Sequence, residues 1–106
     1  MRSQPVVLLT DVEADIRIAL DFYNSWLTQG GPRFYERFKE TVSWIEWNAE
    51  MFPKKYRYFR RAIIRKSYFG VYYVVGEEAT TLVAVLDLRQ NPRAIRALLL
   101  TRPKSD

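Results

Sequence analysis

The chain has 106 residues, a length that suits one domain around one hydrophobic core, and we expect residues 1–106 to form a single domain. Hydrophobic residues make up 48% of the sequence and cysteine is absent, which excludes a disordered polypeptide, a disulfide-stabilised scaffold and a thiolate metal site. Thr10 and Asp11 end the first apolar run, which is too short for a signal peptide or a membrane span. We therefore expect a cytoplasmic protein that does not contact a membrane.

The formal net charge of +5 is distributed unevenly along the chain. Residues 1–50 contain five basic and eight acidic side chains, whereas residues 51–106 contain twelve basic and four acidic ones, so the two halves carry net charges of −3 and +8. This asymmetry favours a polyanionic partner, either nucleic acid or an acidic protein segment. A basic surface that only keeps a small protein soluble is the alternative.

The first half of the chain predicts a short strand followed by a helical hairpin. Residues 6–9 form an apolar run typical of a buried strand, and Thr10 or Asp11 is expected to cap the next helix. Apolar residues recur at three- and four-residue spacing from there to about residue 29, and again from Pro32 to about residue 51, with two glycines making the turn between. The expected apolar stripes are Val12, Ile16, Ala19, Tyr23 and Trp26, then Phe34, Phe38, Thr41, Val42 and Ile45.

The second half of the chain predicts strands and a short closing helix. Residues 58–66, 69–75 and 80–88 are rich in β-branched and aromatic side chains, and a turn with one glycine separates the last two runs. Asn91 and Pro92 suit the cap and the first turn of a C-terminal helix. The predicted order is β-α-α-β-β-β, an α+β fold in which a helical hairpin packs on one face of a mostly antiparallel sheet and a short C-terminal helix follows.

Five segments occur along the chain in a specific order: DIRIALDFY, GGPRFYERF, WNAEMFP, YFRRAIIRKSYFGVYYVV and LVAVLDLRQNP. Each segment is common alone, but their order and spacing over residues 6–93 resemble the RelE/ParE superfamily, the toxins of type II toxin–antitoxin systems of the plasmid-stabilisation type. The resemblance implies the same fold, growth inhibition and a cognate antitoxin that wraps the toxin. It also implies one of two targets, DNA gyrase or the mRNA on a translating ribosome.

The most conspicuous feature of the sequence is a basic run, residues 54–66, that is interleaved with aromatic residues and contains no acid. Guanidinium groups give bidentate contacts to phosphate and aromatic faces stack on bases, a mixture that suits single-stranded RNA; a solvated strand is the alternative. Strand alternation places Arg61 and Arg65 on one face and Arg60 on the other, and the two lysines that open the run are interpreted as loop residues that aid solubility. The candidate residues for binding a target or nucleic acid are Tyr58, Arg60, Arg61, Arg65, Arg89 and Arg93.

Asp87 and Arg89 alternate onto one face at the end of the last predicted strand. In nuclease members of the superfamily this strand end supplies catalytic residues, so the resemblance adds Asp87 and Arg89 to Arg61 and Arg65 of the basic run as catalytic candidates if the chain is an mRNA endonuclease. RNA cleavage needs a base and an acid with pKa values near the working pH, yet the chain has no histidine, and Ile95 stands where many nuclease members have a tyrosine. Asp87 could act as the base; an ion pair of Asp87 with Arg89 or Arg61 is the alternative.

The predicted C-terminal helix carries an apolar stripe that includes Ile95, Leu98 and Leu99. These three residues are the candidate contact surface for the antitoxin or for a second copy of the chain in a homodimer. Folding of the stripe onto the chain's own core is the alternative.

The remaining chemistry is restricted by what the sequence lacks. Without histidine or cysteine the common zinc sites and triad hydrolysis are excluded, and no glycine-rich phosphate loop is present, so we expect no metal and no cofactor. The missing acid–base residues favour a toxin that acts by binding, with DNA gyrase as the leading target. A ribosome-dependent mRNA endonuclease and a non-toxic binding module of the same fold are the alternatives.

Overall fold

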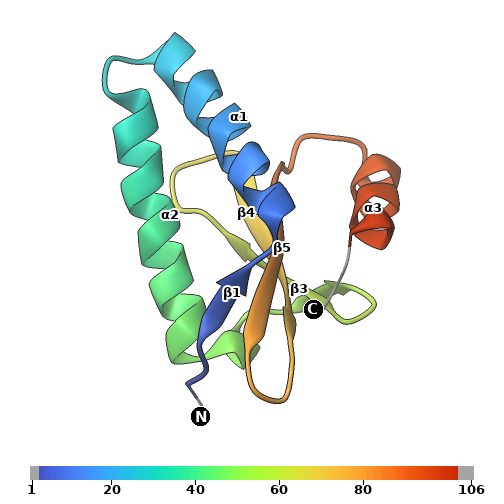
Figure 1. Ribbon diagram of the computed structural model, residues 1–106. Helices are drawn as coiled ribbons and strands as arrows, with labels where there is room; N and C mark the ends of the chain where they lie inside the picture. Colours follow the sequence, from blue (N-terminus) through green and yellow to red (C-terminus); the bar gives the residue numbers. More distant parts are fainter. Residues whose placement is uncertain (1–2, 103–106) are drawn as a thin grey trace.

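The computed structural model describes residues 3–102, in which two helices cover one face of a five-stranded sheet and a third helix lies against the other face (Figure 1). The elements in chain order are β1 (Val6–Leu8), α1 (Thr10–Trp26), α2 (Gly30–Trp47), the 3₁₀ helix η1 (Ala49–Met51), β2 (Lys54–Tyr56), β3 (Phe59–Ile63), β4 (Phe69–Val75), β5 (Thr80–Asp87) and α3 (Pro92–Thr101). The strand order is β1-β5-β4-β3-β2, with β1 parallel to β5 and the other pairs antiparallel. The predicted α+β class, helical hairpin and C-terminal helix are confirmed, and β2 and η1 are additional elements. Within residues 3–102, no helix is both long and apolar enough to cross a membrane.

The turn between α1 and α2 is made by Gln29 and not by the two glycines that follow it. Gln29 adopts a left-handed conformation with a φ of 62° and directly precedes α2, so Gly30 and Gly31 lie in the first turn of that helix. A Cβ atom at Gly30 would lie 2.2 Å from the carbonyl oxygen of Tyr23. Gly30 therefore allows the close approach of the two helices, and the prediction that the glycines reverse the chain is wrong.

The start and the end of α1 also differ from the prediction. The helix already includes Thr10, and Leu9 precedes it without a side-chain cap, so the expected cap by Thr10 or Asp11 is wrong. Trp26, expected in the apolar stripe, is the last residue of the helix and is 61% exposed. The rest of the α1 stripe and the whole α2 stripe are buried or packed against the core as predicted.

The core beneath the hairpin is built from aromatic rings. Phe34 of α2 is 1% exposed; its ring stacks on Tyr23 of α1 at 5.2 Å and meets Phe69 of β4 edge-on at 5.5 Å. The hydroxyl of Tyr23 accepts a hydrogen bond from the backbone N–H of Tyr68 at 2.9 Å, so its polar end is satisfied. Burial of each such ring contributes about 1.5–3 kcal/mol, which makes this cluster a main source of stability.

Side chains along β4 alternate between the two faces of the sheet. Phe69 faces the hairpin, whereas Tyr72 lies beside α3. The register pairs Tyr72 with Arg61 of β3 and Ala84 of β5, and directly paired residues share a face. Arg61 therefore lies on the α3 face of the sheet.

The predicted strand over residues 58–66 is shorter in the structure, because left-handed residues flank it. Arg57 has a φ of 53° and Lys66 a φ of 57°, and neither conformation is compatible with an extended strand. The chain turns at Arg57, which lets residues 54–56 pair with β3 as β2. The two lysines interpreted as loop residues thus belong to a short edge strand.

An ion pair covers the edge of β5 beyond the end of β1. Asp15 of α1 accepts a hydrogen bond from the backbone N–H of Val85 at 2.9 Å, and Arg102, directly after α3, donates to the carbonyl oxygen of Val83 at 3.0 Å. The Arg102 guanidinium also binds both carboxylate oxygens of Asp15. This pair satisfies backbone groups that β1 leaves unpaired, and it ties the end of α3 to α1.

Candidate binding site beneath the C-terminal helix

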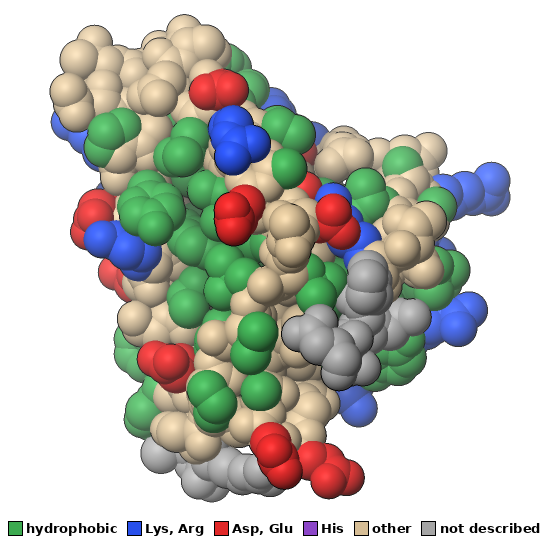
Figure 2. Space-filling view, in the orientation of Figure 1, with side chains coloured by type: hydrophobic (Ala, Val, Ile, Leu, Met, Phe, Trp, Pro, Cys, Tyr) green, Lys and Arg blue, Asp and Glu red, His purple; other side chains and the backbone are tan. Residues whose placement is uncertain are grey.

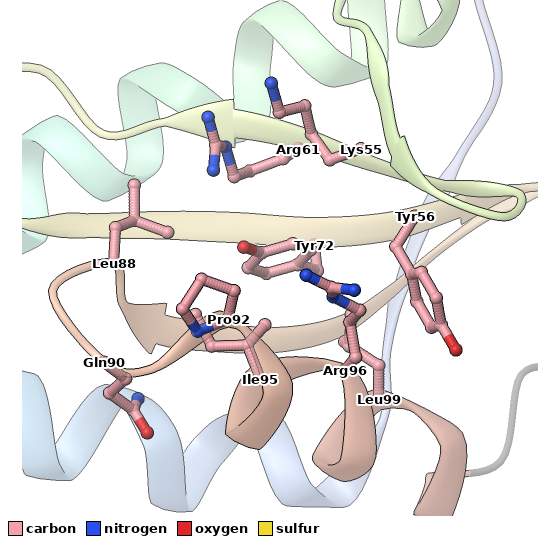
Figure 3. Close-up of a pocket in the computed structure, with 10 residues that line it drawn as sticks. All are labelled: Lys55, Tyr56, Arg61, Tyr72, Leu88, Gln90, Pro92, Ile95, Arg96 and Leu99. Carbon is pink, nitrogen blue, oxygen red and sulfur yellow. The ribbon is translucent and has the colours of Figure 1, made fainter.

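A cavity of about 380 Å³ lies between α3 and the sheet face opposite the hairpin (Figure 3). β2 and β3 form one wall, α3 the other, and β4 the floor, where Tyr72 lies. Pro92 starts α3 at its first position, and the side chain of Asn91 caps the helix by accepting from the backbone N–H of Arg93 at 2.8 Å. The lining residues are Lys55, Tyr56, Arg61, Tyr72, Leu88, Gln90, Pro92, Ile95, Arg96 and Leu99.

The charged residues of the lining are all cationic. Lys55 comes from β2, Arg61 from β3 and Arg96 from α3, and no acidic side chain among residues 3–102 lines the cavity. The Nε atom of Arg61 is buried and has no hydrogen-bond partner among these described residues. A buried donor without an acceptor costs about 1–3 kcal/mol, so this site is electrostatically incomplete and favours the entry of an anion. On the α3 side of the molecule, Lys and Arg side chains project from the surface (Figure 2).

The aromatic residues of the cavity are already covered. The Tyr56 ring stacks on Phe59 with an interplanar angle of 5°, and the guanidinium carbons of Arg57 and Arg96 lie 5.3 and 5.8 Å from its centroid. Tyr72 is 3% exposed. Tyr72 therefore offers no face on which a base could stack, and a base at Tyr56 would have to compete with the two guanidinium groups.

Three of the predicted binding residues have other partners in the structure. Arg60 faces the hairpin side and donates to the carbonyl oxygens of Phe52 at 2.6 Å and Glu50 at 3.2 Å. Arg65 forms an ion pair with Glu40 of α2 at 3.1 Å, which raises the pKa of its guanidinium. Tyr58 lies on the turn before β3, 42% exposed, with its ring 4.9 Å from that of Phe59.

Asp87 and Arg89 pair with each other at the end of β5. The guanidinium of Arg89 donates to both carboxylate oxygens of Asp87, at 2.7 and 3.0 Å, and lies 4.1 Å from the Tyr68 ring and 5.2 Å from the Phe22 ring. The hydrogen bonds from Arg89 lower the pKa of the Asp87 carboxyl. An ion pair of Asp87 with Arg89 was one of the expected alternatives to catalysis, and a carboxylate with a lowered pKa is a weak base.

The four catalytic candidates thus have three separate sets of neighbours. Arg61 lines the cavity, Arg65 contacts α2, and the Asp87–Arg89 pair lies against α1. Among the described residues, no group of three or more histidine, cysteine or acidic side chains is arranged to hold a metal ion.

The apolar stripe of α3 packs on the chain's own core. Ile95 is 8% exposed, Leu99 is fully buried and Leu98 is partly buried. The structure therefore favours the second of the two alternatives for this stripe: unless α3 moves, Ile95 and Leu99 can meet a partner only inside the cavity that they line. Arg93 is exposed on the same helix and does not line the cavity.

Sequence reasoning missed five polar or aromatic residues of the cavity: Lys55, Tyr56, Tyr72, Gln90 and Arg96. For Arg96 a signal was present, because it follows Pro92 by four residues and precedes Leu99 by three, which places it on one helix face with both. For Tyr72 no local signal existed, since its face depends on the pairing of β4 with its neighbours.

These features define an α+β domain with a sealed hairpin face and a cationic cavity under its last helix. A solved structure described as "Chromosomal ParDE TA system from P. aeruginosa" contains a chain with this fold: the TM-score is 0.72, the sequence identity is 12%, and the match covers 81% of this chain and 97% of that chain. At this identity the likeness is one of fold. No protein-family model and no curated protein matches the sequence.

Proposed function

We propose that the protein is the toxin of a type II toxin–antitoxin pair, a single-domain cytoplasmic growth inhibitor neutralised by a cognate antitoxin, with DNA gyrase as the leading target. The observation that carries the proposal is the likeness of fold to almost the whole of a chain from a ParDE toxin–antitoxin system. The five sequence segments support it as well, because their order and spacing resemble the RelE/ParE superfamily.

Action by binding is supported over RNA cleavage by the state of the candidate catalytic groups. Cleavage of RNA by general acid–base catalysis needs a base and an acid close to the same phosphate. Asp87 is held as a carboxylate by Arg89, and Arg65 is paired with Glu40 on another element. Tyr73 is fully buried, its hydroxyl donates to the carbonyl oxygen of Ala49, and burial raises its pKa to about 12, so it is not placed to act as the acid.

Induced expression in a bacterial host tests the toxin assignment. We expect growth arrest that is relieved when the product of an adjacent antitoxin reading frame is expressed with it, and inhibition of DNA supercoiling when the purified protein is added to gyrase. Normal colony formation by cells that contain soluble protein would instead support a non-toxic binding module.

An mRNA endonuclease is the second candidate, and the cationic cavity is the observation that favours it. Primer extension on transcripts from arrested cells separates the two candidates. Under the gyrase proposal, transcripts remain uncut. Ribosome-dependent cuts that disappear in Arg61→Ala or Arg89→Ala would establish the nuclease instead.

A further inference from the structure

We propose that the cavity beneath α3 is a carboxylate-binding site, and that its occupant is a Glu or Asp side chain within an apolar-flanked, acidic segment of a partner protein. The inference deepens the proposed function, because it names the face and the chemistry by which the antitoxin would be recognised. It rests on that function only for the identity of the partner.

The first reason is the unmatched positive charge inside the cavity. Lys55, Arg61 and Arg96 come from three different elements, yet within the described part of the chain no acidic side chain lines the cavity and the buried Nε of Arg61 lacks an acceptor. Two other arginines of the basic run show the contrast, since Arg60 donates to two carbonyl oxygens and Arg65 to Glu40. A carboxylate would supply the acceptor that Arg61 lacks.

The second reason concerns the kind of anion. A single-stranded nucleic acid gains much of its affinity by stacking bases on exposed aromatic rings. Here Tyr72 is almost fully buried, and the guanidinium carbons of Arg57 and Arg96 lie 5.3 and 5.8 Å from the centroid of the half-buried Tyr56 ring. The cavity therefore has several cations that can bind an anion but little exposed aromatic surface on which a base could stack.

The third reason is the apolar part of the lining. Leu88, Pro92, Ile95 and Leu99 line the cavity together with the cations; Lys55 and Arg61 lie on the β2–β3 side, whereas Arg96 projects from α3 beside the apolar residues (Figure 3). An acidic side chain with aliphatic neighbours matches both parts of this lining. The net charge of +8 on residues 51–106 would also accelerate the approach of an acidic segment.

Nuclear magnetic resonance on the full chain tests the proposal directly, because the Nε–Hε group of Arg61 gives its own signal. The probes are the peptide acetyl-Leu-Glu-Leu-Glu-Leu-amide, the same peptide with Gln in place of Glu, a single-stranded oligouridylate and inorganic phosphate. We expect the acidic peptide to shift the Arg61 signal and the backbone signals of Tyr56 and Arg96. Affinity for the Gln peptide should be lower by at least about tenfold, since a hydrogen bond to a charged group is lost.

Two variants and a matched control locate the effect. Arg61→Gln should weaken binding of the acidic peptide by at least about tenfold, and Arg96→Gln, at an exposed helix position that tolerates change, by about two- to fivefold. Arg17→Gln removes the same charge from an exposed position on α1, on the hairpin face, and should leave the affinity unchanged within about twofold. If Arg61→Gln does not fold, the Arg96→Gln measurement still decides.

Three outcomes would overturn the proposal: no shift of the Arg61 signal with the acidic peptide, tighter binding of oligouridylate at the same residues, or equal affinity for both peptides and phosphate. The second outcome would make the cavity a nucleic-acid site, and the third a general anion site. Growth arrest without peptide binding would remove this inference alone, whereas peptide binding without growth arrest would remove the toxin assignment alone.

Discussion

The hairpin face and the α3 face of the sheet differ in how completely their groups are matched. On the hairpin face, the Phe34 ring contacts those of Tyr23 and Phe69, and even the Tyr23 hydroxyl has a partner. On the α3 face, a helix of only 10 residues covers the sheet incompletely and leaves a cavity with an unpaired Arg61 nitrogen. Both faces belong to the same strands, and side-chain alternation keeps them separate.

This difference shows how a small domain separates stability from recognition. Well-packed aromatic contacts stabilise the folded state, whereas an unsatisfied buried polar group destabilises it. A site that keeps an unpaired donor for a ligand is therefore best separated from the packed core. With one sheet between them, the hairpin face compensates for the incomplete α3 face. Substitutions on the two faces should therefore have different consequences.

The largest expected effect is on the hairpin face. Phe34→Ala should lower the free energy of unfolding by about 4 kcal/mol, because it removes the central ring of a packed cluster. Urea unfolding measures the change. Tyr35→Ala, at a 41% exposed position next to it, is the control and should cost about 0.5 kcal/mol or less. Equal effects of the two substitutions would mean that this cluster is not the main source of stability.

The next effect concerns the attachment of α3. Asp15→Ala should cost about 3 kcal/mol, because it leaves the buried Arg102 guanidinium and the Val85 N–H without their acceptor. Amide hydrogen exchange should accelerate more in α3 than in α2, since the ion pair ties the end of α3 to α1. The control is Asp11→Ala, which removes a 54% exposed carboxylate 3.7 Å from Arg102 and should change little. Uniform acceleration in both helices would show that α3 does not open separately.

The elements that could be predicted from the sequence are those set by local pattern. Spacing alone placed Phe34, Phe38 and Ile45 in the core, and the Asn91 cap was visible before Pro92 because both preferences arise within one helical turn. Left-handed residues were not visible: Gln29 has no local feature that demands a positive φ.

The candidate site could be predicted only in part, because its contacts link distant parts of the chain. Arg61 was selected from the basic run, but the same run gave Arg65, whose partner Glu40 is 25 residues away. The Arg102–Asp15 pair joins residues 87 positions apart, so no local pattern in the sequence could reveal it. Only the register of the strands shows which arginines share a face.

A smaller effect should come from the lower end of the hairpin face. Tyr73→Phe leaves the carbonyl oxygen of Ala49 without its donor and should cost about 1 kcal/mol at neutral pH. Burial raises the pKa of Tyr73 to about 12 in the folded protein, whereas its usual value is 10.0, so the folded state keeps a proton that the unfolded state loses. The stability of the parent chain should therefore fall as the pH rises from about 10 to about 12, and this contribution should be absent in Tyr73→Phe. The same alkaline loss in both proteins would assign it to other groups.

The smallest effect on stability is expected at Asp87, one of the catalytic candidates, which lies on the hairpin face. The side chains of Asp87 and Arg89 are 26% and 48% exposed, so solvent screens their ion pair. Asp87→Asn should therefore destabilise the protein less than Phe34→Ala, Asp15→Ala or Tyr73→Phe. Because Arg89 lowers the pKa of Asp87 in the folded state, the contribution of the carboxylate is present at neutral pH and is lost as the pH falls below the usual range of aspartate. Parent and variant should thus converge in stability in acid.

The same substitution tests the division between the two faces in cells. If the protein acts by binding and its α3 face recognises the antitoxin, Asp87→Asn should arrest growth as the parent chain does, whereas Arg61→Gln should weaken rescue of growth by the co-expressed antitoxin. A general base contributes about 10²- to 10⁴-fold to the rate of a reaction, so a nuclease that used Asp87 would lose its toxicity with this substitution. Plating after induced expression, with both variants first shown to be folded, distinguishes the two results. Loss of toxicity in Asp87→Asn alone would place the active groups beside α1 and remove the functional distinction between the faces.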